Sequence, residues 1–251
     1  MTIYSCEADL VSMLTCIYVA WASGLGHRNV ELRLEPIEQY TLFDEYVHVD
    51  ADYQKAQSVT DSVKRKISPY FYSQLSYNAM SYEADVLDNM YRVMILGFAY
   101  GPEVLKRYEF RDIMRFSEIH TRLGKEACHF KEFLRFHQIR EDLYIAHVEP
   151  RSRIIWALSE DFTDRMPSEN WMIVDDTHKI AAVHQKNEES YFQKLSEDEY
   201  DRLLLTEKQN DEFTDLWKLF FETIAIKERA NAKCQRNLFP VWKRKHAVEF
   251  M

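Results

Sequence analysis

Apolar residues recur at helical spacing through the first hundred residues. The clearest stripe has apolar side chains three or four positions apart, at Leu10, Met13, Leu14, Ile17, Tyr18 and Trp21. This spacing predicts a helix of about four turns with one buried face. Further helices are predicted at Asp52–Ile67, Pro69–Tyr77 and Tyr82–Tyr100. Short strands are predicted at Ile3–Tyr4, Val30–Leu34 and Tyr46–Val49.

A second region begins near Glu109 with a long helix. Its narrow apolar seam consists of Phe116, Ile119, Leu123, Ala127, Phe130 and Leu134. The pattern then changes, and it predicts a strand at Leu143–Val148, a helix at Arg153–Arg165 and paired strands at Trp171–Asp175 and Ile180–His184. A last amphipathic helix is predicted from Phe213 to Ile224.

These elements indicate an α+β fold. We expect a mostly helical N-terminal region at residues 1–108. A C-terminal domain at residues 109–251 would pack helices on a small antiparallel sheet and end in a basic tail.

Composition supports a folded, acidic protein with a segregated positive segment. The chain has 251 residues, 46% of them hydrophobic, and a net charge of −9. The segment from Lys227 to His246, however, contains seven Lys or Arg residues and one acid, so its net charge is +6. The start of the chain lacks the pattern of a secretory signal, and no apolar run approaches the roughly 20 residues of a membrane span. The four cysteines are scattered, so we expect reduced thiols. Reduced thiols indicate a cytoplasmic location, and the absence of a membrane span indicates no membrane contact.

The basic tail is the first candidate site. If a helix continues through it, Arg229, Lys233 and Arg236 share one face, and their cations can neutralise phosphates. Phe239 and Trp242 offer flat surfaces for stacking of an unpaired base. The expected nucleic-acid contacts are Arg229, Asn231, Lys233, Gln235, Arg236, Lys243 and Arg244. Alternatively, Asn231 caps a helix and the two aromatic side chains belong to the core.

Glu126 is the first catalytic candidate, because it leans toward the apolar seam of the long helix. A buried carboxylate needs a partner, and Arg122 and Arg135 are the nearest arginines in sequence. Glu126 and His129 have the spacing of di-iron ligands, but such sites need a second copy on another helix. The only other such pair lies in a predicted strand, so we expect no metal site. Glu126 is therefore either an acid/base group or half of an internal ion pair.

Asp175 and Arg165 are the other catalytic candidates. Asp175 ends a predicted strand, with Asp176 and His178 close by, where an acid can serve catalysis or form a turn. Arg165 could bind an anion or the carbonyls at the end of its helix. Phosphate-binding loops, dinucleotide fingerprints, zinc-protease motifs and serine-hydrolase motifs are absent, so we expect no cofactor.

Several segments carry a family resemblance that covers nearly the whole chain. The most specific is LWKLFFETIAIKERANAKCQ at residues 216–235, with Pro240 and Glu249 following it. Others are Tyr4-x-Cys6-Glu7 with LTCIYVAWAS, Tyr40-x-Leu42-Phe43-x-Glu45-Tyr46, ILGF at 95–98, Glu126 with FLRF at 133–136, Phe162-x-x-Arg165, and Trp171–Asp175. Together they resemble a bacterial family described as DNA repair or DNA metabolism proteins. Its members accompany a radical S-adenosylmethionine protein, and in some a related region is fused to a uracil-DNA glycosylase domain.

The chain departs from the family pattern at a few positions. Cys128 stands where the family usually has His two residues after its Glu, and His129 follows it. His178 stands where Arg is common, and the tail has Trp242 and Arg244 near the family's Trp position. The family has no established reaction to carry over, so whether the chain is an enzyme is left open.

Three hypotheses follow from the sequence and the resemblance. The leading one is a DNA-repair accessory protein that binds DNA through the tail and acts with a radical S-adenosylmethionine partner, and with uracil-DNA glycosylase as a further expected partner. The second is a glycosylase or hydrolase in which Glu126 and Asp175 are the acids and Arg165 and Arg229 steady anionic charge. The third is a protein-binding scaffold whose tail contacts an acidic partner.

Overall fold

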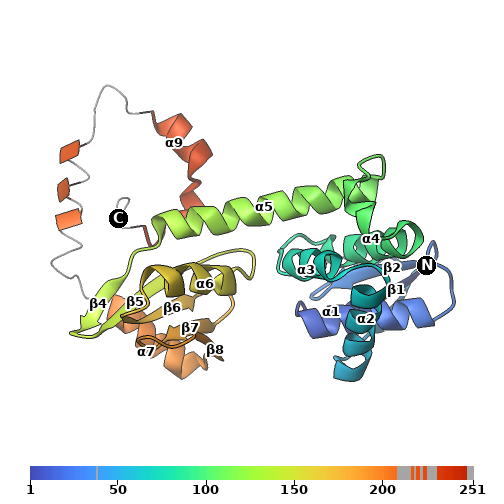
Figure 1. Ribbon diagram of the computed structural model, residues 1–251, viewed down its shortest axis with the longest axis horizontal. Helices are drawn as coiled ribbons and strands as arrows, with labels where there is room; N and C mark the ends of the chain where they lie inside the picture. Colours follow the sequence, from blue (N-terminus) through green and yellow to red (C-terminus); the bar gives the residue numbers. More distant parts are fainter. Residues whose placement is uncertain (38, 208–215, 218, 221–222, 225–230, 248–251) are drawn as a thin grey trace. The chain divides into compact units, whose positions relative to one another are not determined.

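The chain folds into two compact units, residues 1–124 and 125–251, which are described separately. The structure, a computed structural model, describes residues 1–37, 39–207, 216–217, 219–220, 223–224 and 231–247 (Figure 1). The division falls inside helix α5 (Arg111–Phe133), whereas the sequence-based boundary at 108 and 109 would assign that helix to the second region. The start of α5 belongs to the first unit because Ile113, Phe116 and Ile119 lie in that unit's core.

The first unit is built on a three-stranded parallel sheet in the order β2-β1-β3. Its strands are β1 (Thr2–Cys6), β2 (Val30–Leu34) and β3 (Glu45–His48). Its helices, besides the start of α5, are α1 (Leu10–Ala22), α2 (Tyr53–Lys66), α3 (Pro69–Asn78), α4 (Val86–Tyr100) and the short η1 (Pro102–Lys106). Side-chain oxygens of Asp9, Asp52 and Ser68 cap the first three of these helices.

Helix α4 begins at Val86, four residues later than predicted from the apolar pattern. The preceding segment is held in place by ion pairs. Arg115 of α5 contacts Glu83 at 2.8 Å and Asp85 at 2.7 Å, and Arg122 contacts Glu83 at 2.8 Å. These contacts join residues 83–85 to α5.

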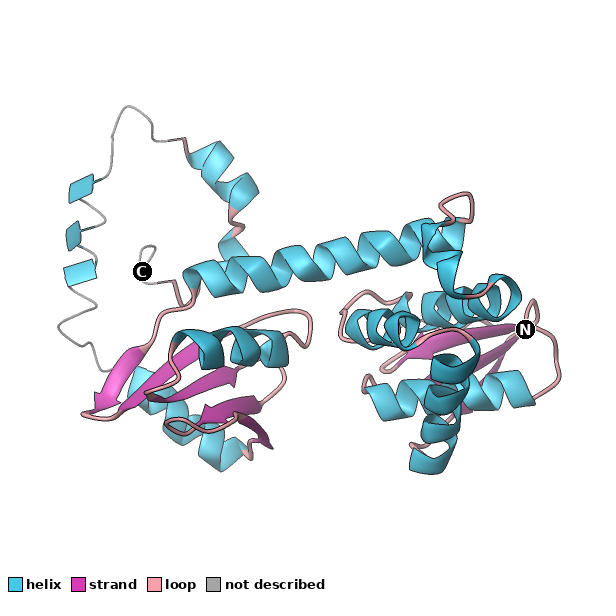
Figure 2. Ribbon diagram, in the orientation of Figure 1, coloured by secondary structure: helices cyan, strands magenta, loops and turns pink. Residues whose placement is uncertain are grey.

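The second unit contains a five-stranded sheet in the order β4-β5-β6-β7-β8 (Figure 2). Its strands are β4 (His137–Arg140), β5 (Leu143–Val148), β6 (Asn170–Asp175), β7 (Ile180–His184) and β8 (Tyr191–Lys194). Its other described helices are α6 (Ile155–Arg165), α7 (Glu197–Glu207), α9 (Ala232–Leu238) and η3 (Val241–Lys243). Half of the helix predicted at Phe213–Ile224 lies outside the described residues.

The α+β class is confirmed, but the second sheet is mixed rather than wholly antiparallel. Strands β5 and β6 are parallel, and α6 connects them, because a helical crossover returns the chain to the same end of the sheet. Parallel pairing brings the carboxyl ends of β5 and β6 together, at Val148 and Asp175.

Successive side chains on β6 alternate between the two faces of this sheet. On one face Val174 packs with Ile145 and with Tyr200 of α7. On the other, Trp171 is fully buried and contacts Phe136, which in turn contacts Phe162 of α6. The alternation matters for the site, because it separates the side chains of neighbouring residues where β6 ends.

Candidate functional site

Glu126 is buried in the second half of α5 and binds the loop that follows β5. Its Oε1 accepts hydrogen bonds from the backbone N–H groups of Arg151 at 2.7 Å and Ser152 at 3.3 Å, and its Oε2 accepts from the Ser152 hydroxyl at 2.6 Å. These donors take the place of the arginine partner expected from the sequence. Arg122 instead contacts Glu83 of the first unit, and Arg135 donates to the carbonyls of Glu132 and Leu134. Glu126 therefore anchors the β5–α6 loop to α5.

Asp175 closes the turn between β6 and β7. Its Oδ1 accepts from the backbone N–H groups of Thr177 and His178 at 3.0 Å each, and its Oδ2 lies 2.7 Å from Nδ1 of His178. Burial raises the pKa of the Asp175 carboxyl, although the contact with His178 opposes that shift. Among the described residues, Asp175 and Glu126 share no hydrogen-bond partner.

Arg165 lies in the last turn of α6 and is 55% exposed. Its Nε contacts Oδ2 of Asp161 at 2.9 Å, one helical turn earlier, and its guanidinium lies over the ring of Phe162. The described contacts of Arg165 are therefore local to α6 and include neither Glu126 nor Asp175.

The basic tail does not continue as a helix through Asn231, which was the condition for Arg229, Lys233 and Arg236 to share one helix face. Asn231 has an extended backbone and caps α9, because its Oδ1 accepts from the N–H of Cys234 at 3.0 Å. Asn231 therefore has the capping role that the sequence left as an alternative. Lys233, Gln235 and Arg236 are exposed on α9. Arg229 lies outside the described residues.

The segment after α9 turns inward against α5. Phe239 is 4% exposed and stacks on Phe133 with ring centroids 3.8 Å apart, so it belongs to the core instead of offering a surface for a base. Trp242 is half-buried beside Phe130, and the guanidinium of Arg151 lies 4.3 Å from its ring centroid. The aromatic side chains of the tail thus attach it to the second unit.

Two cations of this segment are also directed at the protein. Nζ of Lys243 lies 2.6 Å from Nδ1 of His129 on α5, and Arg244 donates twice to the carbonyl of Phe239, at 2.9 and 2.7 Å. Burial lowers the pKa of Lys243, and it lowers the pKa of His129, with the Lys243 charge adding to the second effect. A neutral His129 can therefore accept a hydrogen bond from Lys243.

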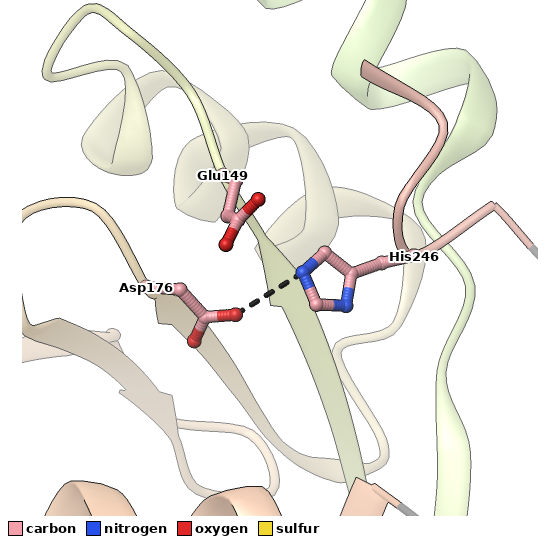
Figure 3. A group of neighbouring side chains, drawn as sticks. All are labelled: Glu149, Asp176 and His246. Carbon is pink, nitrogen blue, oxygen red and sulfur yellow. Dashed lines mark ion pairs between the residues drawn. The ribbon is translucent and has the colours of Figure 1, made fainter. Parts of the chain in front are cut away.

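Glu149, Asp176 and His246 converge at the carboxyl ends of β5 and β6 (Figure 3). One ligand atom from each lies within 4.8 Å of the other two. Glu149 directly follows β5, Asp176 directly follows β6, and His246 comes from the tail. Within the described ranges, this is the one group of His, Cys, Asp and Glu side chains that converges in this way.

Asp176 is the buried centre of this cluster. Nδ1 of His147 lies 2.9 Å from its Oδ1, and Nε2 of His246 forms an ion pair with its Oδ2 at 3.1 Å. Burial works to raise the pKa of Asp176, but the contacts with His147 and His246 outweigh burial and bring the pKa to about 2. Asp176 is therefore an anion at neutral pH.

A pocket lies beside the cluster, between α5, the end of β5 and the tail. Its polar lining includes His147, Glu149, Lys243 and His246, and Phe130 and Trp242 contribute apolar walls. Lys245 extends from the tail to Oε1 of Glu149. Carboxyl ends of parallel strands are common ligand sites in open α/β sheets, and here the tail supplies one side of the pocket.

The sequence predicted Asp175 as a catalytic candidate, whereas the acid that converges with Glu149 and His246 is its neighbour Asp176. The alternation along β6 was a usable signal, since it places adjacent side chains on opposite sides of the sheet. His147 and Glu149 could have been noticed as polar residues around the end of a predicted strand. Nothing local to His246 indicated that it meets Asp176, because that contact spans 70 residues of sequence.

Comparison with known proteins places the cluster within a recognised domain. The model of the family DUF4130, a domain of unknown function, matches residues 84–249, which include every residue of the cluster. No curated protein matches the chain. None of the helices in the described part of the chain combines the length and the apolar character that crossing a membrane requires.

Proposed function

This chain belongs to the DUF4130 family, and we propose that it works in DNA metabolism by binding nucleic acid through the exposed face of α9. The observation that carries the proposal is the pair Lys233 and Arg236. Both are exposed, and neither forms an ion pair with a carboxylate among the described residues. In a protein of net charge −9, such a surface favours a polyanion over most other ligands.

The spacing on α9 suits a phosphate backbone. Lys233 and Arg236 are three residues apart, so their side chains project from the same side of the helix. Gln235 is also exposed on α9 and can donate to a phosphate oxygen or a base edge, although its position two residues after Lys233 directs it to another side of the helix. Lys243 and Arg244, which the sequence grouped with these contacts, are proposed to act mainly by attaching the tail, because their described partners are His129 and the Phe239 carbonyl.

The family resemblance supports DNA metabolism as the process in which this binding would take part. It implies a radical S-adenosylmethionine protein as partner and a link to uracil-DNA glycosylase, and work on DNA agrees with the cytoplasmic location expected from the sequence. In this proposal, the chain presents DNA to an enzyme partner. An enzymatic role for Glu126 and Asp175 receives less support, because each is engaged by its own local donors.

A charge-matched comparison tests the proposed surface. The double variant Lys233→Ala/Arg236→Ala removes both cations of α9, and Lys186→Ala/Lys194→Ala removes two exposed lysines elsewhere in the second unit as a control. Binding of single-stranded and duplex DNA is measured by fluorescence anisotropy at several salt concentrations. We expect the α9 variant to weaken binding and to reduce the slope of log K against log salt by about 1.4 to 1.8, because two phosphate contacts are lost.

Two outcomes would contradict the proposal. If the two double variants lose affinity equally, binding depends on overall charge rather than on α9. If the wild-type chain captures the radical S-adenosylmethionine protein but shows no salt-dependent DNA binding, the tail serves as a protein-binding scaffold instead.

A further inference from the structure

We propose that Glu149, Asp176 and His246 bind a divalent transition-metal ion. Their ligand atoms lie within 4.8 Å of one another, and Oδ2 of Asp176 and Nε2 of His246 are 3.1 Å apart. Ligand distances near 2.0–2.2 Å place two ligand atoms of one ion roughly 3 to 3.5 Å apart in a tetrahedral site. Small side-chain rotations are therefore enough to bring all three atoms to one ion.

The contact between Asp176 and His246 supports a shared ion. Oδ2 of Asp176 is buried, and Nε2 of His246 lies 3.1 Å from it as an ion pair whose geometry is not that of a hydrogen bond. Two ligand atoms this close, without the alignment of a hydrogen bond, are arranged as they would be around a common cation.

His147 provides a second, independent indication that the pocket receives a polar ligand. It lines the same pocket as Glu149 and His246, and its side chain is 1% exposed. Its buried Nε2 has no hydrogen-bond partner in the part of the chain that the structure describes. Its other nitrogen, Nδ1, is hydrogen-bonded to Oδ1 of Asp176 at 2.9 Å, so Oδ2 of Asp176 is the oxygen that would bind the ion. His147 is thus a positioning residue that holds a metal ligand in place.

The charges of the cluster match a dication. Glu149 and Asp176 contribute two negative charges, and Lys245 contacts Oε1 of Glu149. The Lys245 side chain is 59% exposed, so an arriving cation can displace it toward solvent while Oε2 of Glu149 takes the ion. One imidazole and two carboxylates favour Zn²⁺ or Mn²⁺, whereas Mg²⁺ prefers oxygen ligands and several retained waters.

Metal titration of the full chain tests this site independently of DNA binding. The chelator-treated protein is titrated with zinc chloride and with manganese chloride by calorimetry, and bound Mn²⁺ is also observed by electron paramagnetic resonance. All proteins carry Cys128→Ser and Cys234→Ser, because exposed thiols bind zinc nonspecifically. We expect one ion per chain for both metals, with weaker binding of magnesium chloride.

Ligand variants decide the assignment. Asp176→Asn and His246→Gln should abolish the stoichiometric site, and His147→Gln should weaken it by about 10- to 100-fold. His48→Gln in the first unit is the control and should bind as the parent does. Far-ultraviolet circular dichroism of the metal-free variants separates loss of the site from loss of the fold. The proposal is overturned if neither Zn²⁺ nor Mn²⁺ binds with unit stoichiometry, or if folded Asp176→Asn and His246→Gln proteins bind both ions as tightly as the parent.

Discussion

Glu126 illustrates how a buried carboxylate is stabilised by backbone and hydroxyl donors. At 5% exposure it would be costly if left unpaired, but three donors from Arg151 and Ser152 surround the two carboxylate oxygens. Hydrogen bonds to an ionised acceptor are stronger than neutral ones, which offsets part of the lost hydration. The residue that the sequence proposed as a catalytic acid thus has a clear role in holding a loop.

Replacing this carboxylate should destabilise the second unit. In Glu126→Gln, an amide NH₂ replaces one acceptor oxygen. It leaves either the backbone N–H groups of Arg151 and Ser152 or the Ser152 hydroxyl without its present acceptor. We expect a loss of about 1–3 kcal/mol in the free energy of unfolding, measured by urea denaturation. The control is Glu132→Gln, which changes an exposed residue of the same helix and should be nearly neutral. Equal stability of both variants would show that the Glu126 contacts contribute little.

At the level of elements, the segment from Phe239 to Ala247 decides what the tail can do. Its attachment uses the stack of Phe239 on Phe133, the packing of Trp242 beside Phe130 and the contact between Lys243 and His129. This attachment brings His246 to Asp176 and leaves the α9 cations exposed. One basic segment therefore supplies both the exposed cations of α9 and the histidine that contacts Asp176.

The attachment of the tail should weaken in mild acid. The folded pKa of His129 is lowered, by burial and then by Lys243, so the unfolded chain binds a proton first as pH falls below 6.5. The stabilisation is present above pH 6.5 and is lost as the pH falls toward the folded pKa, when protonated His129 repels Lys243. We expect faster hydrogen exchange in residues 241–247 at pH 5.5 than at pH 7.5, after correction for the intrinsic rate.

The variant His129→Gln should remove this pH dependence, since its amide oxygen can accept from Lys243 at either pH. His120→Gln is a matched control, because His120 lies on the same helix and burial also lowers its pKa. It should leave the pH response of the tail unchanged. A pH response that persists in His129→Gln would assign it to other groups.

For the whole molecule, the two units have separate cores that share one helix. The first unit packs tightly around Gly97 of α4, where an added Cβ would lie 2.7 Å from Cδ1 of Ile67 and 2.9 Å from the Phe71 ring. Contacts of that length require neighbouring side chains to move. The second unit has its own sheet and its own cluster, and both the proposed metal site and the proposed DNA surface belong to it.

Gly97→Ala should therefore destabilise the first unit by about 1–3 kcal/mol through overpacking. Hydrogen exchange followed by mass spectrometry should show lost protection in α2 and α4, with strands β5–β7 retaining theirs. Gly124→Ala is the control, because its Cβ would lie 3.6 Å from the Tyr77 hydroxyl, an ordinary contact, and alanine favours a helix by up to about 1 kcal/mol. Equal loss of protection in both units after Gly97→Ala would show that they unfold together.

The sequence by itself determined the α+β class and most of the elements, because periodicity reports which side of an element is buried. Strands β2, β5 and β7 have the predicted bounds, and the ends of α2, α3 and α6 lie within two residues of the predicted ends. Elements with weak apolar patterns escaped prediction. Strand β8 is exposed throughout, β4 is only four residues long, and α7 is rich in acids at its start.

Only the tertiary structure decided the parallel pairing of β5 with β6, the inward course of the tail and the meeting of Glu149, Asp176 and His246. Local patterns carry no information about which distant segments meet, since such contacts depend on packing across the whole unit. The same limit explains why the sequence pattern indicated Asp175, and not Asp176, as the candidate acid. Both acids look alike along the chain, and their roles differ because one closes a turn while the other contacts a histidine 70 residues away.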